Sequence, residues 1–208
     1  MTTNFIKTEK QYISRLASIL AVACLGIISS CESDDPVKED VPELITKATL
    51  TFTPPTGAPV VATATDPDGD GIKDLEVDGP INLAANKDYT LTIQLINGLA
   101  AVSDPAYNIT EEVEEEADEH MFFFAWTNNT FSDPAGNGNI DNRADAVNYL
   151  DDDSSGLPLG LETGWTTAGA SSGDFQVILK HQPELKSATS GVNDGETDLD
   201  ISFTLNVQ

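Results

Sequence analysis

The sequence predicts an all-β domain, an antiparallel Ig-like β-sandwich of roughly 8–10 strands. Several segments rich in Thr, Val, Ile and Tyr alternate apolar with polar residues, which is the period of a half-buried strand. Clusters of Pro, Gly, Asn and Asp separate these segments. No stretch shows convincing amphipathic helical spacing, and residues 141–150 allow only one short helical turn. Short strands with frequent turns are typical of a sandwich.

Residues 1–30 are interpreted as a lipoprotein signal peptide. Basic residues come first, and residues 16–28 form an apolar stretch too short to span a membrane. The stretch ends in ISSC at residues 28–31, which resembles a bacterial lipobox, in which the cysteine is acylated and becomes the mature N-terminus. We therefore expect lipidation at Cys31 and a membrane anchor. An ordinary cleaved signal is the alternative, and Cys24 is a poorer acylation site.

Residues 31–44 follow as a tether that is rich in acids and proline and has no hydrophobic periodicity. Its start, ESDD, resembles the acidic export signal that sends lipoproteins of Bacteroidota to the outer face of the outer membrane. We therefore expect a lipid-anchored protein of the outer membrane that faces the exterior. The periplasmic face is the alternative.

The sandwich domain is expected over residues 45–208. Its clearer strands are predicted at 46–54, 58–66, 72–79, 87–97, 107–116, 120–126, 173–181 and 198–207. In the last of these, the odd-numbered residues from Leu199 to Val207 face one way, and Asp198 and Asp200 face the other. Residues 128–173 are rich in Gly, Asn and Asp, with two weak strands near 146–150 and 159–166, so this region is expected to be a long surface excursion.

The formal net charge of −25 excludes nucleic acid as a partner, because such a surface repels phosphates and concentrates cations. The sequence also argues against an enzyme. It contains no G-x-S-x-G motif, no phosphate-binding glycine loop and no Cys/His zinc cluster, and neither histidine lies in a recognisable nucleophile context.

The stretch DPDGDGIKD resembles part of a calcium-binding loop. Asp66, Asp68, Asp70 and Asp74 occupy positions 1, 3, 5 and 9 of the pattern, from which carboxylates can converge on one ion. The acid expected at position 12 is replaced by Val77, which predicts weak affinity and a structural role for the ion. The alternative is a polar Asp-Gly turn between two strands that needs no metal.

Residues 111–126, EEVEEEADEHMFFFAW, join an acidic run to an aromatic one. Residues 111–119 are predicted to form an exposed edge strand or rim, whose like charges discourage pairing with other chains. Residues 120–126 are predicted to form a strand with His120, Phe122, Phe124 and Trp126 on one face. Because both faces are apolar, this strand is expected to be central.

The two histidines predict a metal site at one rim of the sandwich. His120 begins one strand and His181 ends another, so they meet if the 173–181 strand lies between strand 120–126 and the last strand. Imidazole and carboxylate together suit zinc or another divalent transition ion. The predicted ligands are His120, His181, Glu119, Glu196 and Asp198, with Glu116 as an alternative to Glu119. In the competing interpretation, the two rim histidines are hydrogen-bonded to nearby acids and bind no metal. Under that interpretation the domain needs neither Zn²⁺ nor Ca²⁺ as a cofactor.

The lipobox and the stretches DPDGDG, ITEEVEEEADEHMFF, LKHQPELKS and GETDLDISF together resemble a family of small Bacteroidota envelope lipoproteins. Members are often named "type 1 periplasmic binding fold superfamily". That name implies two α/β lobes with many helices, which conflicts with the strand pattern here. The resemblance implies an envelope lipoprotein whose task is not defined. One role that it suggests is that of an accessory to TonB-dependent uptake.

Two functions remain open. In the first, the domain is a lipid-anchored, non-enzymatic module that captures a cation or small ligand for an outer-membrane receptor. In the second, it is a structural or adhesive surface domain without a specific ligand, because a sandwich fold alone does not imply a function.

Overall fold

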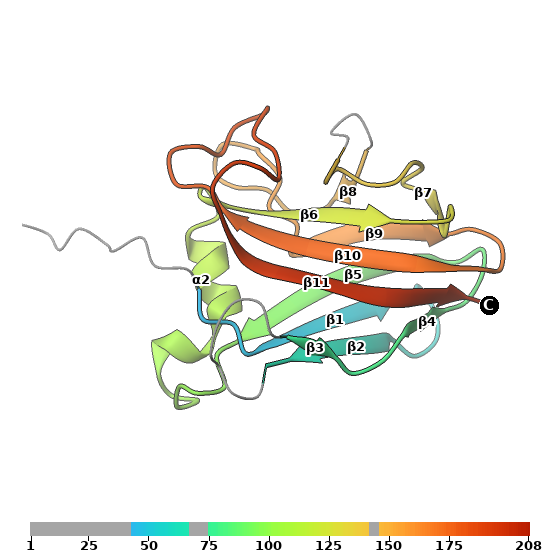
Figure 1. Cartoon of the computed structure of the whole chain (residues 1–208), viewed down its shortest axis with the longest axis horizontal. Helices are drawn as coiled ribbons and strands as arrows, with labels where there is room; N and C mark the ends of the chain where they lie inside the picture. The colour runs from blue at the N-terminus through green and yellow to red at the C-terminus, as the bar shows by residue number, and fades with distance from the viewer. Residues whose placement is uncertain (1–42, 67–74, 142–145) are drawn as a thin grey trace, which may run out of the picture. The chain divides into compact units, whose positions relative to one another are not determined.

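The all-β sandwich is confirmed in a computed structural model that describes residues 43–66, 75–141 and 146–208. These residues belong to one compact unit, Val41–Gln208. Two sheets face one another, and a short helix lies at one end (Figure 1). Cys31 and the tether up to residue 42 lie outside the described residues, so the lipid anchor stays a prediction.

Within the described ranges the chain forms eleven strands, four of them only two or three residues long. The strands are β1 (Lys47–Thr53), β2 (Val60–Thr65), β3 (Glu76–Val77), β4 (Ile81–Leu83), β5 (Asp88–Ile96), β6 (His120–Trp126), β7 (Phe131–Asp133), β8 (Asn148–Tyr149), β9 (Glu162–Thr167), β10 (Ser171–His181) and β11 (Glu196–Val207). Weak strands were expected near 146–150 and 159–166, and β8 and β9 are found there. Strands β4 and β7 are not among the predicted strands.

The larger sheet has the order β3-β2-β1-β5-β9-β7, with β8 also paired to β9, and the smaller sheet has the order β4-β11-β10-β6. Every pair is antiparallel except β4 with β11. Strand β10 therefore lies between β6 and β11, the order on which the expected meeting of the two histidines depends.

Both sheets contribute their inner faces to one core. Along β11 the predicted alternation holds from Leu199 to Val207, where every odd-numbered residue is buried. Phe175 of β10 lies at the centre of an aromatic cluster, with ring centroids 5.2 Å from Trp165, 5.8 Å from Phe52 and Phe131, and 6.1 Å from Phe124. Most of these pairs are edge-to-face, the arrangement that aromatic quadrupoles prefer.

The predicted strand at 107–116 and the predicted acidic edge strand at 111–119 are wrong. A 3₁₀ turn, η1 (Pro105–Tyr107), leads into a helix, α2 (Ile109–Glu115). Only Ile109 and Val113 of this helix are buried, and their spacing of four places them on one helical face. Glutamate favours helices and is depleted in strands, so the acidic run supports helix where it was interpreted as strand.

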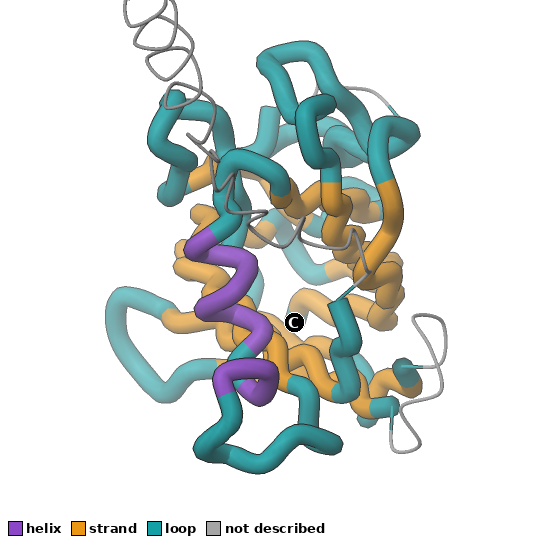
Figure 2. The backbone as a smooth tube through the Cα atoms, turned by 90° about the vertical axis from the view of Figure 1, so that its left-hand side faces the viewer, coloured by secondary structure: helices purple, strands orange, loops and turns teal. Residues whose placement is uncertain are grey.

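Helix α2 packs against the end of β5. Figure 2 shows the helical segment beside strands of the sandwich. The Thr110 hydroxyl accepts a hydrogen bond from the Leu95 backbone amide at 2.7 Å and donates one to the Leu95 carbonyl at 3.1 Å. Two glutamates in the first turn, Glu111 and Glu112, lie at the positive end of the helix dipole. The end of α2 is thereby held beside the start of β6.

The expectation that β6 is central is also wrong, because β6 is the edge strand of the smaller sheet. Loop segments cover its open edge instead of another strand. The Phe122 amide donates to the Leu159 carbonyl at 2.8 Å, and the Asn139 amide donates to the Phe124 carbonyl at 2.9 Å. Both faces of β6 can therefore be apolar although the strand lies at an edge.

The outer face of β6 is buried under these loops in a second apolar cluster. It consists of Met121, Phe123 and Ile178, with Ile140, Tyr149 and Val192 packed against them. The face assignment made from the sequence holds, since Phe122, Phe124 and Trp126 belong to the main core on the other side. The 128–173 region thus closes a sheet edge.

Replacing Tyr149 with phenylalanine should lower the free energy of unfolding by about 1–3 kcal/mol. The Tyr149 hydroxyl donates to the Phe122 carbonyl and accepts from the Asn139 side-chain amide, both at 2.7 Å. Its loss leaves two polar groups without that partner. Denaturant unfolding measures the change, with Tyr107→Phe as the control. A loss within about 0.5 kcal/mol, the range of ordinary surface changes, would contradict this role.

Candidate metal centre

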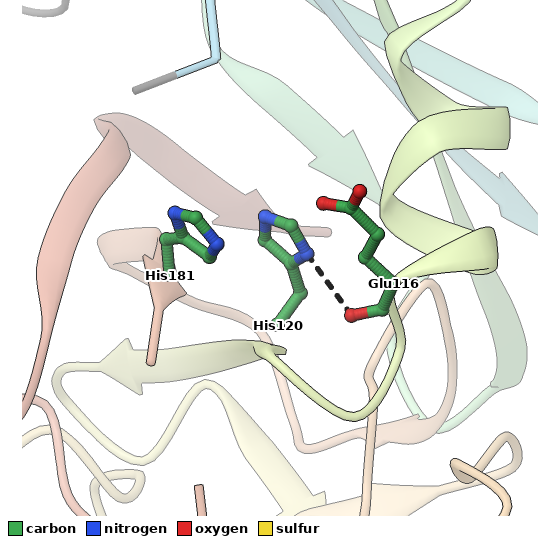
Figure 3. A group of neighbouring side chains, drawn as sticks. All are labelled: Glu116, His120 and His181. Atoms are coloured by element: carbon green, nitrogen blue, oxygen red, sulfur yellow. Dashed lines mark hydrogen bonds between the residues drawn. The ribbon is translucent and has the colours of Figure 1, made fainter. Parts of the chain in front are cut away.

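The two histidines form a directly opposed cross-strand pair, His120 on β6 and His181 on β10. Their rings stack with centroids 4.6 Å apart and planes 7° from parallel. The side chain of His120 is fully buried, and that of His181 is 7% exposed. Figure 3 shows His120 between His181 and the Glu116 side chain, which comes from the end of α2.

A backbone carbonyl fixes the protonation of His120. Its Nδ1 lies 3.2 Å from the Glu116 carbonyl oxygen, which can only accept a hydrogen bond. Nδ1 must therefore carry a proton, and in the neutral ring the lone pair lies on Nε2. Metal-binding histidines are usually oriented in this way, with the second ring nitrogen donating to a carbonyl or carboxylate.

His181 has a similar arrangement with a carboxylate. Its Nε2 lies 3.2 Å from Oε2 of Glu119, whose side chain is 38% exposed. A proton on Nε2 leaves the lone pair of the neutral ring on Nδ1. Glu119 is held in turn by its own carbonyl, which accepts a hydrogen bond from the Gln182 amide at 2.6 Å.

A β-bulge brings the side chain of Asp198 beside the two histidines. The pairing of β10 with β11 shifts between Leu179 and Lys180, so that Leu199 and Thr197 have partners and Asp198 is the extra residue. The predicted outward orientation of Asp198 is therefore wrong, and its side chain is fully buried. Its Oδ2 lies 3.6 Å from Nε2 of His120.

Burial raises the pKa of Asp198 to about 6, because the charged carboxylate loses its hydration there. His181, the Glu43 backbone amide and Lys180 oppose this rise, and Glu196 adds to it. Neither carboxylate oxygen has a hydrogen-bond partner of normal geometry among the described residues. Such a buried polar group calls for an explanation.

Glu116, His120 and His181 each offer one ligand atom within 4.8 Å of the others. Two imidazoles and a carboxylate suit zinc and its neighbours better than calcium, which prefers six to eight oxygens. Zinc bonds of about 2.0–2.1 Å with tetrahedral angles put ligand atoms roughly 3.4 Å apart. The donor types therefore fit, and binding requires the ligand atoms to approach one another by up to about 1.4 Å and the rings to turn out of their parallel stack.

The other predicted ligands are placed less favourably. The Glu119 carboxylate contacts His181 but is partly exposed, and Glu196 pairs with His181 in the sheet register but is exposed. Asp66 is buried at the end of β2, where its amide donates to the Thr46 carbonyl at 2.7 Å. The remaining loop residues, Asp68, Asp70 and Asp74, lie outside the described residues, so the calcium loop stays a prediction.

A buried ion pair, which the sequence did not reveal, holds the segment that carries the site. Nζ of Lys186 lies 3.0 Å from Oδ2 of Asp153, and each side chain is only 1% exposed. The same ammonium donates to the Ala117 carbonyl at 2.5 Å, directly after Glu116. Lysine and aspartate this far apart in the sequence give no local signal that they pair.

Comparison with known proteins finds no match to a family model, to a curated protein or to a solved structure. The resemblance to envelope lipoproteins therefore stays a prediction. In the described part of the chain, no helix combines the length and apolar character needed to cross a membrane.

Proposed function

We propose that this domain is a non-enzymatic binding module that captures a divalent transition-metal ion, with zinc as the reference ion. The observation that carries the proposal is the convergence of Glu116, His120 and His181, whose ligand atoms lie within 4.8 Å of one another. They come from a helix end and two neighbouring strands, so the fold presets their positions. Histidine is the commonest metal ligand of proteins, and a carboxylate neutralises part of the charge of the ion.

The distribution of charge over the domain supports cation capture. The connections at the histidine end include 97–119, 150–161 and 182–195, which carry many acids and the single base Lys186. The connections at the opposite end are 54–59, 84–87, 127–130 and 168–170, which contain no acid. Exposed acids such as Asp88 and Asp174 also lie near the opposite end, but the connections make the negative field stronger at the histidine end. A stronger negative field raises the local cation concentration there.

The cellular setting is part of the proposal and rests on the sequence alone. Acylation of Cys31 and the acidic tether place the module on the outer membrane, facing the exterior, or alternatively on its periplasmic side. A lipid-anchored module that concentrates a metal ion there would serve an outer-membrane receptor.

Titration calorimetry with Zn²⁺ tests the proposal. The wild type should bind one ion per chain, and the variant carrying His120→Gln and His181→Gln should lose that event. The two proteins do not differ in cysteine, so any zinc binding by a cysteine thiol would be the same in both. The variant Glu111→Gln, Glu114→Gln changes two exposed acids of α2 and should bind zinc as the wild type does.

Equal zinc binding by the wild type and a folded double-histidine variant would overturn the proposal. That result would favour the second function, a structural surface domain without a ligand. One observation favours this alternative, namely that both histidines already have hydrogen-bonding contacts, with the Glu116 carbonyl and the Glu119 carboxylate. In that case the histidine substitutions would change stability alone.

A further inference from the structure

We propose that Asp198 is a direct ligand of the ion, so that the site is a closed set of two histidines and two carboxylates. This inference rests on the proposed function and names the residue that completes it. A closed shell of four protein ligands is typical of sites that hold zinc, whereas catalytic sites keep a position open for water or substrate.

The first support is the separation between Asp198 and His120. At 3.6 Å, Oδ2 and Nε2 are too far apart for a normal hydrogen bond. The same distance suits two ligands of one zinc ion, since bonds of about 2.0–2.1 Å put tetrahedral neighbours roughly 3.4 Å apart. This separation would change little on ligation by one ion, while the ligand atoms of Glu116 and His181 would still have to close toward it.

The second support is the burial of the Asp198 carboxylate. It is fully buried, and neither of its oxygens accepts a hydrogen bond of normal geometry from the described residues. A charged carboxylate that is buried without hydrogen bonds destabilises the fold, because it loses its hydration. A cation bound to it would offset that cost. This observation is independent of the grouping of Glu116, His120 and His181.

The third support is the backbone that places Asp198. Regular alternation along β11 would send its side chain outward, like that of Asp200, and the bulge opposite Leu179 and Lys180 turns it inward. Bulges are common next to functional sites, where they redirect one side chain. The tautomer of His120 completes the arrangement, because its lone pair lies on Nε2, the ring nitrogen 3.6 Å from Oδ2 of Asp198.

Asp198→Asn in the full chain tests the inference, because asparagine keeps the shape of the side chain and removes its charge. Replacing a residue that only hydrogen-bonds to a metal ligand costs about 10–100-fold in metal affinity, so loss of a direct ligand should weaken Zn²⁺ binding by at least about 10-fold. The matched control is Asp200→Asn, an exposed aspartate on the same strand, which should leave the affinity unchanged. Circular dichroism establishes that both variants are folded.

Co²⁺ provides a second readout that a purely structural role of Asp198 would not change. The wild type should show the intense visible absorption of four-coordinate cobalt, and Asp198→Asn should shift and weaken it. Unchanged zinc affinity and cobalt spectrum in Asp198→Asn, with binding lost in the double-histidine variant, would overturn the Asp198 inference while the proposed function stands. Binding that survives both sets of substitutions would overturn both.

Discussion

Replacing Phe175 with alanine should lower the free energy of unfolding by about 3–5 kcal/mol, the cost of removing a fully buried phenylalanine. Phe175 is fully buried, and its ring contacts aromatic rings from both sheets, including Phe52 of β1 in the larger sheet and Phe124 of β6 in the smaller one. Its removal loses the hydrophobic free energy gained by burying the ring. It also leaves a cavity that rigid neighbours such as Trp165 fill poorly.

Chemical denaturation of wild type and Phe175→Ala measures this effect. The control is Leu150→Ala, at a leucine that is 56% exposed, where the change should stay within about 0.5 kcal/mol. Phe175→Leu, which refills part of the space, should recover part of the loss. A Phe175→Ala protein as stable as the Leu150→Ala protein would mean that the two sheets do not share this cluster as one core.

The sandwich could be predicted because its strands carry their burial pattern in the sequence. Along β11, alternation from Leu199 to Val207 specifies which face is buried. The meeting of His120 and His181 followed from the same reasoning, since one assumption about strand order places both at one rim. Local patterns of this kind report the direction of a side chain within its own strand.

The sequence does not predict helix α2 because the helix is short and only two of its residues, Ile109 and Val113, show the helical spacing of buried positions. The signal was present in the spacing of these residues and in the helix-favouring glutamates between them. Glu116 was predicted only as the alternative to Glu119, and its position at the helix end is what brings it to His120.

Other features depend on contacts between distant segments and have no local signal. The bulge at Asp198 is defined by its pairing with β10 and cannot be seen in β11 alone. The position of β6 at a sheet edge was also hidden, because loop residues such as Asn139 and Leu159 cover its edge. Two apolar faces indicate that a strand is covered, without showing what covers it.

The ion pair of Lys186 with Asp153 should have the second large effect. Lys186→Met should lower the free energy of unfolding by about 3–5 kcal/mol at pH 7, because it leaves a buried carboxylate without its cation. Both side chains are only 1% exposed, so water cannot replace the lost contact. The matched control is Lys47→Met at the start of β1, where we expect a change within about 0.5 kcal/mol.

The pH dependence of this loss identifies the charge as its cause. Burial raises the pKa of Asp153, but the Leu157 amide, Lys186 and the Ser155 amide outweigh it and hold that pKa below its ordinary value of 3.8. In the wild type, Asp153 therefore contributes stability above about pH 4 that is lost as the pH falls through its folded pKa. Without Lys186 its pKa should rise, and protonation then relieves the penalty. The difference between wild type and Lys186→Met should shrink from pH 7 to pH 4.

A double-mutant cycle separates the pair from the packing of the lysine stem. Asp153→Asn alone should also destabilise the domain, because it leaves the Lys186 ammonium buried without its carboxylate. Combined with Lys186→Met it should cost less than the sum of the two single changes. Additive losses, or a loss in Lys186→Met that does not change with pH, would contradict the role of the ion pair. Because Nζ of Lys186 also holds the Ala117 carbonyl beside Glu116, Lys186→Met should weaken zinc binding as well.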